Sequence, residues 1–235
     1  MTILAIFDMD DTIIDCDSSS LWLRYLVQRG VAAADMLVTE QAMMQAYHLG
    51  ELSMAQYMDF TLQPLSGVAV SEVERWADDF VSSMISTRIF PAARQQIEWH
   101  RQQGNTLLII SATADFIVRR IAAMLGVSEV IAIELEQVAG NFTGATKGVL
   151  SFREGKVERL QAWLQNHGNS LQGSYGYSDS VNDLPLLHAV QHACVVNPAP
   201  ALKQVSDQHQ WRQYDWQLAQ HESNVTGQTQ GVACR

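Results

Sequence analysis

The chain has 235 residues, of which 47% are apolar, and its formal net charge is −10. This length is enough for one large domain, or for one domain with a second inserted in it. No stretch is rich in Lys or Arg, and binding to nucleic acids or anionic membranes draws on such positive charge. We therefore expect neither a nucleic-acid partner nor a membrane partner.

The three cysteines, Cys16, Cys194 and Cys234, are odd in number and widely spaced. This pattern indicates reduced structural thiols rather than a disulfide framework or a zinc site. The seven histidines show no HxH or HExxH spacing, which argues against a metalloenzyme with histidine ligands. The first apolar run is too short for a signal peptide, and no later run approaches the ~20 residues of a membrane span. We expect a cytoplasmic protein.

Five short apolar runs are typical of buried parallel strands, whose two faces are both covered. They lie at 3–7, 106–110, 130–135, 174–178 and 193–196. Helical patterns separate them at 92–103, 115–125, 156–167 and 184–190, and Gly126 is placed to end the second of these. Strands alternating with helices predict an α/β fold with a doubly wound, Rossmann-like parallel sheet.

One stretch, residues 16–90, breaks this alternation. It is rich in Met, Leu, Ala and Gln and predicts four helices, at about 18–29, 31–48, 53–62 and 70–86. Its methionines indicate helix-bundle core, with an adaptable binding surface as the alternative. We expect a catalytic core of 1–15 and 91–220, an inserted helical domain of 16–90 and a flexible polar tail of 221–235.

Acidic and hydroxyl side chains follow these predicted strands, and the carboxyl ends of parallel strands form the ligand crevice of such sheets. Asp8-Met9-Asp10-Asp11-Thr12 follows the first strand. Two carboxylates two residues apart can bind one hard cation, or can divide the work of nucleophile and acid–base. A solvated acidic turn is the alternative.

Three later positions add to this set. The hydroxyl of Ser111, followed by backbone amides from Ala112 onward, can hold a phosphate oxygen or can cap a helix. Lys156 in GKVERL starts a helix and is either a phosphate ligand or an exposed charge, with Lys147 as a competitor. In SDSVNDLP, Asp179 would complete a metal site, and Asp183 would support it or cap the next helix.

In this order, DxDxT, the serine after an apolar run, GKxxxL and SDSxNDLP resemble the motifs of the haloacid dehalogenase superfamily. More narrowly, they are similar to the branch of phosphoserine phosphatases and bacterial histidinol-phosphate phosphatases. The resemblance covers about residues 3–200. It implies a magnesium-dependent phosphatase that acts on a small phosphorylated metabolite.

The resemblance also implies a role for each motif residue. Asp8 would attack phosphorus and form an aspartyl-phosphate, and Asp10 would protonate the leaving alcohol and then activate water. The other implied roles are phosphate binding by Ser111, Ala112 and Lys156, magnesium binding by the Asp8 side chain, the Asp10 carbonyl and Asp179, and support of that metal shell by Asn182 and Asp183. These needs agree with phosphoryl transfer, which relies on electrostatic stabilisation.

The inserted helices resemble the cap that closes over the site in this branch, where it selects the substrate. Asp17 stands nine positions after Asp8, where phosphoserine phosphatases have an acidic residue that contacts the substrate amine; it could equally be a helix N-cap. The arginine that holds the substrate carboxylate falls on Thr61 here, and a threonine cannot replace it. We expect an amine-bearing ester without a carboxylate, such as L-histidinol phosphate.

Three other functions stay open on the sequence. Phosphoserine phosphatase-like activity and a phosphotransferase or phosphomutase reaction would use the same nucleophile. A regulatory or binding module on the same fold is the non-enzymatic alternative. The oligomeric state is not determined by the sequence.

Overall fold

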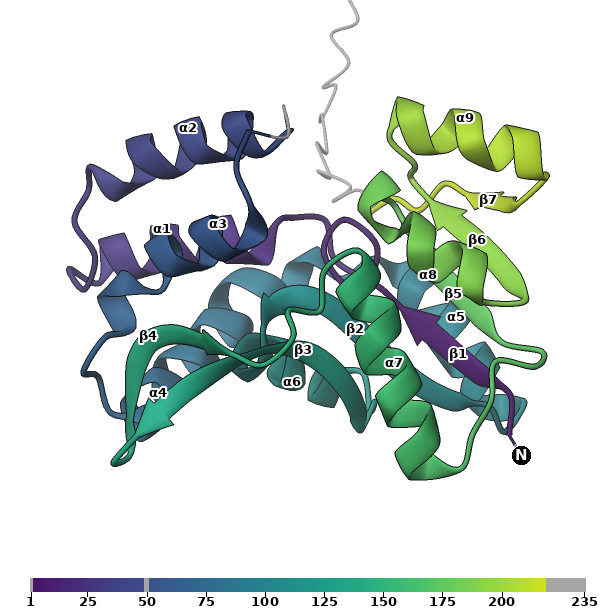
Figure 1. Ribbon diagram of the computed structural model, residues 1–235, viewed down its shortest axis with the longest axis horizontal. Coiled ribbons are helices and arrows are strands. Elements are labelled where there is room, and N and C mark those ends of the chain that lie inside the picture. Colours follow the sequence, from purple (N-terminus) through teal and green to yellow (C-terminus); the bar gives the residue numbers. More distant parts are fainter. Residues whose placement is uncertain (1, 49–50, 219–235) are drawn as a thin grey trace, which may run out of the picture.

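The structure is a computed structural model that describes residues 2–48 and 51–218, so the predicted tail of 221–235 lies outside the described residues. Within them, seven strands form one sheet in the order β4-β3-β2-β1-β5-β6-β7 (Figure 1). The strands are β1 Leu4–Phe7, β2 Thr106–Ala114, β3 Glu129–Val138, β4 Asn141–Lys147, β5 Tyr175–Ser178, β6 His192–Val196 and β7 Arg212–Tyr214.

All neighbouring strands are parallel except β4, which pairs antiparallel with β3. β1 lies between β2 and β5, so the chain leaves β1 to build one half of the sheet and returns to build the other. This is the switch point at which open α/β sheets bind ligands, outside the carboxyl ends of the strands. The predicted α/β fold with a doubly wound sheet is confirmed.

Helices cover both faces of the sheet. Those described are α1 Ser18–Gln28, α2 Met36–His48, α3 Met54–Thr61, α4 Val70–Phe80, α5 Pro91–Gln102, α6 Asp115–Met124, α7 Glu154–His167, α8 Leu184–Ala189 and α9 Pro200–His209. None of the described helices has the length and apolar character needed to cross a membrane. The helix predicted at 115–125 ends as expected, since Gly126 follows it with φ +64°.

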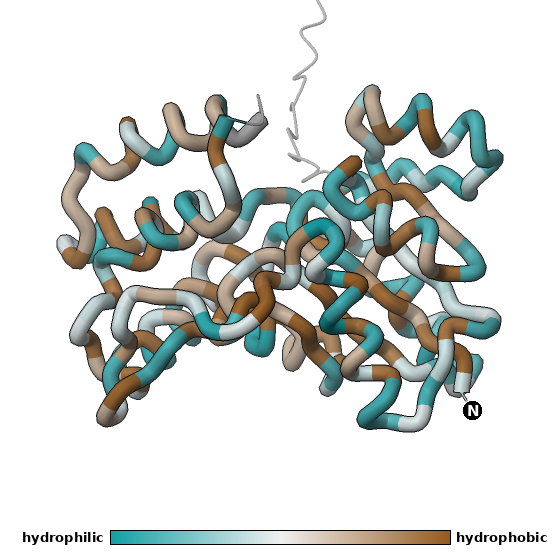
Figure 2. The backbone as a smooth tube through the Cα atoms, in the orientation of Figure 1, coloured by the Kyte–Doolittle hydropathy of each residue, from teal (hydrophilic) through white to brown (hydrophobic). Residues whose placement is uncertain are grey.

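Alternation along β1 divides the hydrophobic core into two clusters. Ala5 and Phe7 face the side covered by α5 and α6, whereas Leu4 and Ile6 face the side covered by α7 and α8. All four side chains are fully buried, which explains the continuous apolar run in the sequence. Figure 2 shows hydrophobic stretches through the strands at the centre of the molecule.

The helices of residues 16–90, called here the helical segment, pack on the first of these clusters. Trp22 of α1, Tyr57 of α3 and Phe80 of α4 belong to the same buried cluster as Phe7. The loop before α4 also pairs with the β3–β4 hairpin, through Gly67 N–H to the Phe142 carbonyl at 2.8 Å and Phe142 N–H to the Val68 carbonyl at 2.9 Å. The helical segment therefore rests on the sheet through both side chains and backbone.

Several predicted boundaries were wrong. α2 begins at Met36 rather than at 31, and the helix predicted to run to 86 is α-helical only to Phe80, after which a π-helical turn covers Val81–Ile85. Helix α9 and strands β4 and β7 were not predicted. β4 reads as Asn-Phe-Thr-Gly-Ala-Thr-Lys, with no apolar run, and its turn uses Ala139-Gly140, both with positive φ, in place of the usual Asn-Gly.

Candidate active site

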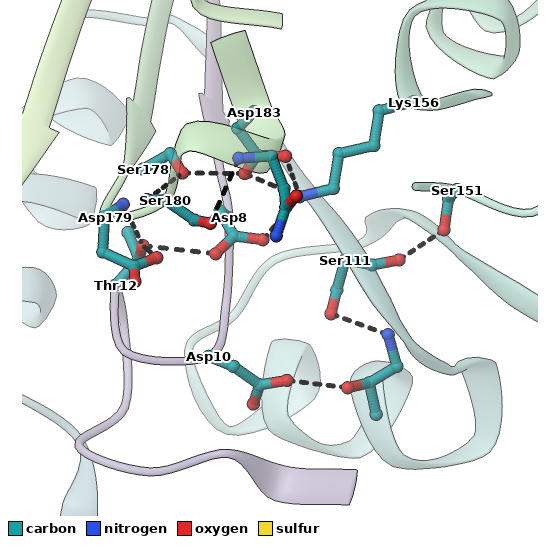
Figure 3. A network of polar contacts seen from close by, with 12 residues as sticks. Asp8, Asp10, Thr12, Ser111, Ser151, Lys156, Ser178, Asp179, Ser180 and Asp183 are labelled. Carbon is teal, nitrogen blue, oxygen red and sulfur yellow. Dashed lines mark hydrogen bonds and ion pairs between the residues drawn. The ribbon is translucent and has the colours of Figure 1, made fainter. Parts of the chain in front are cut away.

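The predicted site residues line one polar cavity at the carboxyl ends of β1, β2 and β5 (Figure 3). The cavity holds about 220 Å³, which suits a small metabolite. From the α/β part of the chain come Asp8, Asp10, Asp11, Ser111, Ala112, Thr113, Phe152, Lys156, Asp179, Ser180, Asn182 and Asp183, and from the helical segment Asp17, Ser19, Met44, Met54 and Tyr57. The sheet topology thus brings together side chains that are up to 175 positions apart (from Asp8 to Asp183).

In the cavity lining, Lys156 joins two carboxylates. Its Nζ lies 2.7 Å from Asp8 Oδ1 and 2.7 Å from a carboxylate oxygen of Asp183, and the lysine is only 3% exposed. Burial disfavours the charged ammonium, but the negative charges of Asp183 and Asp8 outweigh it and raise the pKa of Lys156. Burial raises the pKa of Asp8 to about 6, although Lys156 opposes this. The lysine is therefore a fixed positive charge beside Asp8.

The start of α7 positions this lysine. A Cβ on Gly155 would lie 2.1 Å from the Leu150 carbonyl oxygen, so only glycine allows the helix to begin this close to the preceding loop. The competing Lys147 is exposed at the end of β4 and lines a different groove, with Asp115 and Arg119. The prediction of Lys156 rather than Lys147 at the phosphate site is therefore consistent with the geometry.

Thr12 links the two carboxylates that were expected to bind magnesium. Its hydroxyl lies 3.2 Å from Asp8 Oδ2 and 3.0 Å from Asp179 Oδ1, and it accepts the Asp179 N–H at 3.1 Å. A hydroxyl has one proton, so it can donate to only one of the two carboxylates at a time. Burial raises the pKa of Asp179 to about 8, and the charges of Asp8 and Asp11 add to this effect. Negative charge on Asp8 and Asp179 at the same time is therefore disfavoured here, and a bound cation would relieve it.

This donor set fits magnesium. Within the residues that the structure describes, no three or more His, Cys, Asp or Glu side chains are grouped as metal ligands. The expected magnesium site needs only two side-chain ligands, the Asp8 and Asp179 carboxylates, because its third ligand is the backbone carbonyl of Asp10. All of these donors are oxygens, the ligands that Mg²⁺ prefers, and Mg²⁺ usually keeps several waters. A cation here would also offset the repulsion that raises the pKa of Asp179.

Asp183 and Asn182 were both expected to support the metal ligands, and the two residues contact different side chains. Asp183 accepts from Lys156 and, at 2.7 Å, from the Ser178 hydroxyl. Asp183 is also the N-cap residue of α8, as one alternative had it, but its carboxylate makes no capping hydrogen bond to that helix. Asn182 lines the cavity and accepts from Arg153 Nε at 3.0 Å.

Asp10 is held by both of its oxygens. Oδ1 accepts the Ser18 backbone N–H at 3.1 Å, and Oδ2 accepts the Thr113 hydroxyl at 2.7 Å. Burial, with the negative charge of Asp17 as the next cause, raises the pKa of Asp10 to about 8. A carboxyl group with this pKa carries a proton at neutral pH, as a general acid must.

The sequence suggested that the strand ends at Ser111, but the strand continues past this residue. β2 continues to Ala114, and its pairing with β3 becomes irregular after Ile110. The Ser111 carbonyl accepts from the Ser151 hydroxyl, while its own Oγ accepts the Thr113 N–H at 3.1 Å. Ser111 and Ala112 line the cavity at this irregularity, next to the first turn of α6.

Asp17 caps α1 and lines the cavity as well. Its Oδ1 accepts the Ser20 N–H at 2.9 Å, which is an N-cap contact. The two alternatives left open by the sequence are therefore compatible. Thr61 instead directs its hydroxyl to the Tyr57 carbonyl of its own helix, at 3.0 Å.

Several polar residues of this site were missed by the sequence reasoning. Thr12 was visible as the last letter of DxDxT, and Ser178 as the first letter of SDSxNDLP. Thr113 and Ser151 carried no motif signal. Glu40, which lies behind the lining residue Tyr57 rather than in the cavity lining, was also missed; it is 6% exposed and accepts hydrogen bonds from Ser20 and from Tyr57 OH.

Comparison with known proteins identifies the family. A sequence model described as haloacid dehalogenase-like hydrolase matches residues 5–188, more than half of the chain. The chain belongs to the haloacid dehalogenase-like hydrolase family. The family predicted from the four motifs is thereby confirmed.

Relatives of this hydrolase agree with the predicted phosphatase branch. A histidinol-phosphatase from Neisseria meningitidis is 35% identical over 88% of this chain and 96% of its own length. A solved protein of unknown function from Bordetella pertussis is 34% identical, with a TM-score of 0.85 over 92% of this chain and 99% of that one. An aspartyl-phosphate intermediate analogue of a phosphoserine phosphatase matches with a TM-score of 0.67 over 91% and 93%; at 18% identity it shows the shared fold alone.

Proposed function

We propose that the protein is a magnesium-dependent phosphomonoesterase that works through an aspartyl-phosphate on Asp8. One observation carries this proposal. Asp8, paired with a buried lysine, and Asp10, with its raised pKa, line the same small cavity. A nucleophile beside a fixed positive charge and a separate proton donor are the two groups that hydrolysis of a phosphate ester requires.

The two half-reactions assign the work to these side chains. An Asp8 oxygen attacks phosphorus, and the bond from phosphorus to the ester oxygen breaks. The leaving oxygen keeps the electron pair of that bond and receives a proton from Asp10. Asp10 then removes a proton from water, whose oxygen attacks phosphorus and releases Asp8 as a carboxylate with inorganic phosphate. Lys156 and the Ser111 hydroxyl, with the backbone N–H of Ala112, hold the phosphoryl oxygens.

Magnesium would be held by Asp8, Asp179 and the Asp10 carbonyl, with Asn182 and Asp183 supporting those ligands. When bound, it supplies positive charge to the phosphoryl oxygens. The cavity contains several carboxylates and, among its described lining residues, Lys156 as its one basic side chain. A dianionic phosphate needs more positive charge than one lysine provides, and this charge balance supports the requirement for a cation.

The helical segment serves as a cap over this cavity. Asp17, Ser19, Met44, Met54 and Tyr57 line it from α1, α2 and α3, opposite the residues of the sheet. A cavity lined from both sides excludes water from the aspartyl-phosphate and lets the cap residues select the substrate.

For the substrate we propose an amine-bearing phosphomonoester such as L-histidinol phosphate. Asp17 lines the cap side of the cavity, where burial and, after it, the negative charge of the nearby Glu40 raise its pKa. Neither carboxylate has an ion-pair partner among the described residues. Buried negative charge without a counter-ion favours a cationic ligand. The histidinol-phosphatase relative points to the same substrate class.

The test is phosphate release from histidinol phosphate, phosphoserine, glycerol phosphate and an aryl phosphate, with and without Mg²⁺. We expect release that requires Mg²⁺, with the highest kcat/KM for histidinol phosphate. Equal rates for phosphoserine and for the two esters without an amine, glycerol phosphate and the aryl phosphate, would contradict the substrate assignment. Transfer of the phosphoryl group to an added alcohol in place of water would identify a phosphotransferase. No release from any ester would contradict the phosphatase and favour a binding module.

A further inference from the structure

Thr113 lies at the point where the sheet, the helical segment and Asp10 meet. It is in β2, two residues after Ser111, and is only 1% exposed. Its hydroxyl oxygen is 2.7 Å from Asp10 Oδ2, 3.1 Å from Ser19 Oγ and 3.3 Å from Ser18 Oγ. One side chain thus contacts the proton donor of the proposed reaction and two hydroxyls in the first turn of α1.

The number of protons determines the direction of these hydrogen bonds. When Asp10 is a carboxylate, the single Thr113 proton goes to Oδ2, so the Ser18 and Ser19 hydroxyls must donate to Thr113. When Asp10 holds the proton for the leaving oxygen, that proton is not shared with Thr113, which continues to donate to Oδ2. A hydroxyl can therefore keep this contact in both states, which a second carboxylate could not, because it would repel the ionised form of Asp10.

We propose that Thr113 is a positioning residue for Asp10, which holds the carboxyl group in one orientation through both halves of the reaction and links it to the first turn of α1. The inference rests on the proposed function of Asp10. With Ser18 N–H on Oδ1 and Thr113 on Oδ2, both oxygens of Asp10 are held, and the residue lines the cavity. The serines make this orientation depend on the placement of the helical segment.

The inference predicts a selective defect. Proton transfer from Asp10 matters when the leaving oxygen is that of an alcohol, because an alkoxide leaves poorly; an aryl oxide leaves well without the proton. General acid–base catalysis contributes about 10²- to 10⁴-fold, and a misplaced acid loses part of it. Loss of Thr113 should therefore lower kcat/KM for alkyl esters more than for aryl esters. The parameter kcat/KM reports the first half-reaction, whereas kcat also contains the hydrolysis of the aspartyl-phosphate, which both esters share.

The test compares wild type, Thr113→Val and Thr113→Ser on one alkyl and one aryl phosphate with Mg²⁺ present. Valine keeps the branched shape that suits a strand but removes the hydroxyl. We expect Thr113→Val to lower kcat/KM for the alkyl ester roughly 10- to 100-fold and for the aryl ester less than about threefold. Thr113→Ser should restore most of the alkyl activity. Ser19→Ala, which removes one hydroxyl from a helix that alanine favours, should shift the same ratio by roughly threefold if the valine variant does not fold.

Equal losses on both esters, or a serine variant as slow as the valine variant, would overturn the inference while the proposed function stands. A wild-type protein that releases phosphate from neither ester would overturn the proposed function and this inference with it. An alkyl-selective loss in kcat/KM that serine rescues is the result that supports a positioning role over a merely structural one.

Discussion

The ammonium of Lys156 lies 2.7 Å from an Asp8 carboxylate oxygen, although 148 residues separate the two in the chain. The same ammonium lies 2.7 Å from Asp183, and all three residues are buried. A buried charge that loses its partner is costly, typically about 3–5 kcal/mol, because the remaining charge is left in a medium that solvates it poorly. This cluster is therefore a point at which stability and catalysis are coupled.

Replacing this lysine should damage both properties. In Lys156→Met, Asp8 and Asp183 lose their shared cation, and we expect phosphate release to fall at least about 100-fold. The free energy of unfolding, measured by urea denaturation at pH 7, should fall by about 3 kcal/mol or more. Lys147→Met removes an exposed lysine and should change both quantities little. A Lys156→Met protein with wild-type activity would exclude this lysine from the site.

Replacing the proposed nucleophile should abolish activity without destabilising the fold. Asp8→Asn preserves the shape of the side chain, and Lys156 keeps Asp183 as a partner, so we expect a small change in Tm but a loss of at least about 10³-fold in kcat. Asp15→Asn, in an exposed carboxylate seven residues later, is the matched control. The measurement is Mg²⁺-dependent phosphate release together with thermal unfolding. Comparable activity of the two variants would contradict nucleophilic attack by Asp8.

The two roles of Asp17 can be separated by two substitutions. Asparagine still accepts the Ser20 N–H as an N-cap but carries no charge, whereas alanine loses both. Asp17→Asn should leave the stability near that of wild type and raise KM for an amine-bearing ester about tenfold, without an effect on glycerol phosphate. Asp17→Ala should show the same KM and, in addition, lose about 1 kcal/mol of stability. A KM unchanged by Asp17→Asn would leave the residue as a cap only.

The buried His100 should make stability depend on pH. Burial lowers its pKa to about 4, while an unfolded histidine titrates near 6.5. Between these values the unfolded chain binds a proton that the folded chain does not, so stability falls as the pH decreases from about 6.5 to 4. The gap corresponds to at most about 3 kcal/mol. Urea denaturation at pH 7 and pH 4.5 should show a smaller loss for His100→Gln than for wild type; equal losses would rule out this contribution.

Much of the fold could be predicted because both faces of the sheet are buried. Five strands appeared as continuous apolar runs, and the residues after β1 and β5 stood out as carboxylates at the ends of those runs. The edge elements carried no such signal. β4 and β7 lie at the two edges of the sheet, where burial on one side only leaves mixed sequences that resemble loops.

The sequence alone determined the family and indicated Asp8, Asp10, Lys156 and Asp179 as candidate site residues, because the motif spacings place these residue types at strand ends and a helix start. Only the tertiary structure decided the contacts that hold them, such as Thr113 against Asp10. Such contacts join positions about a hundred residues apart, and their residue types, mostly Ser and Thr, are common everywhere in a chain. The physical reason is that a hydroxyl gains its role from the neighbour that packing brings to it, and local sequence does not encode that neighbour.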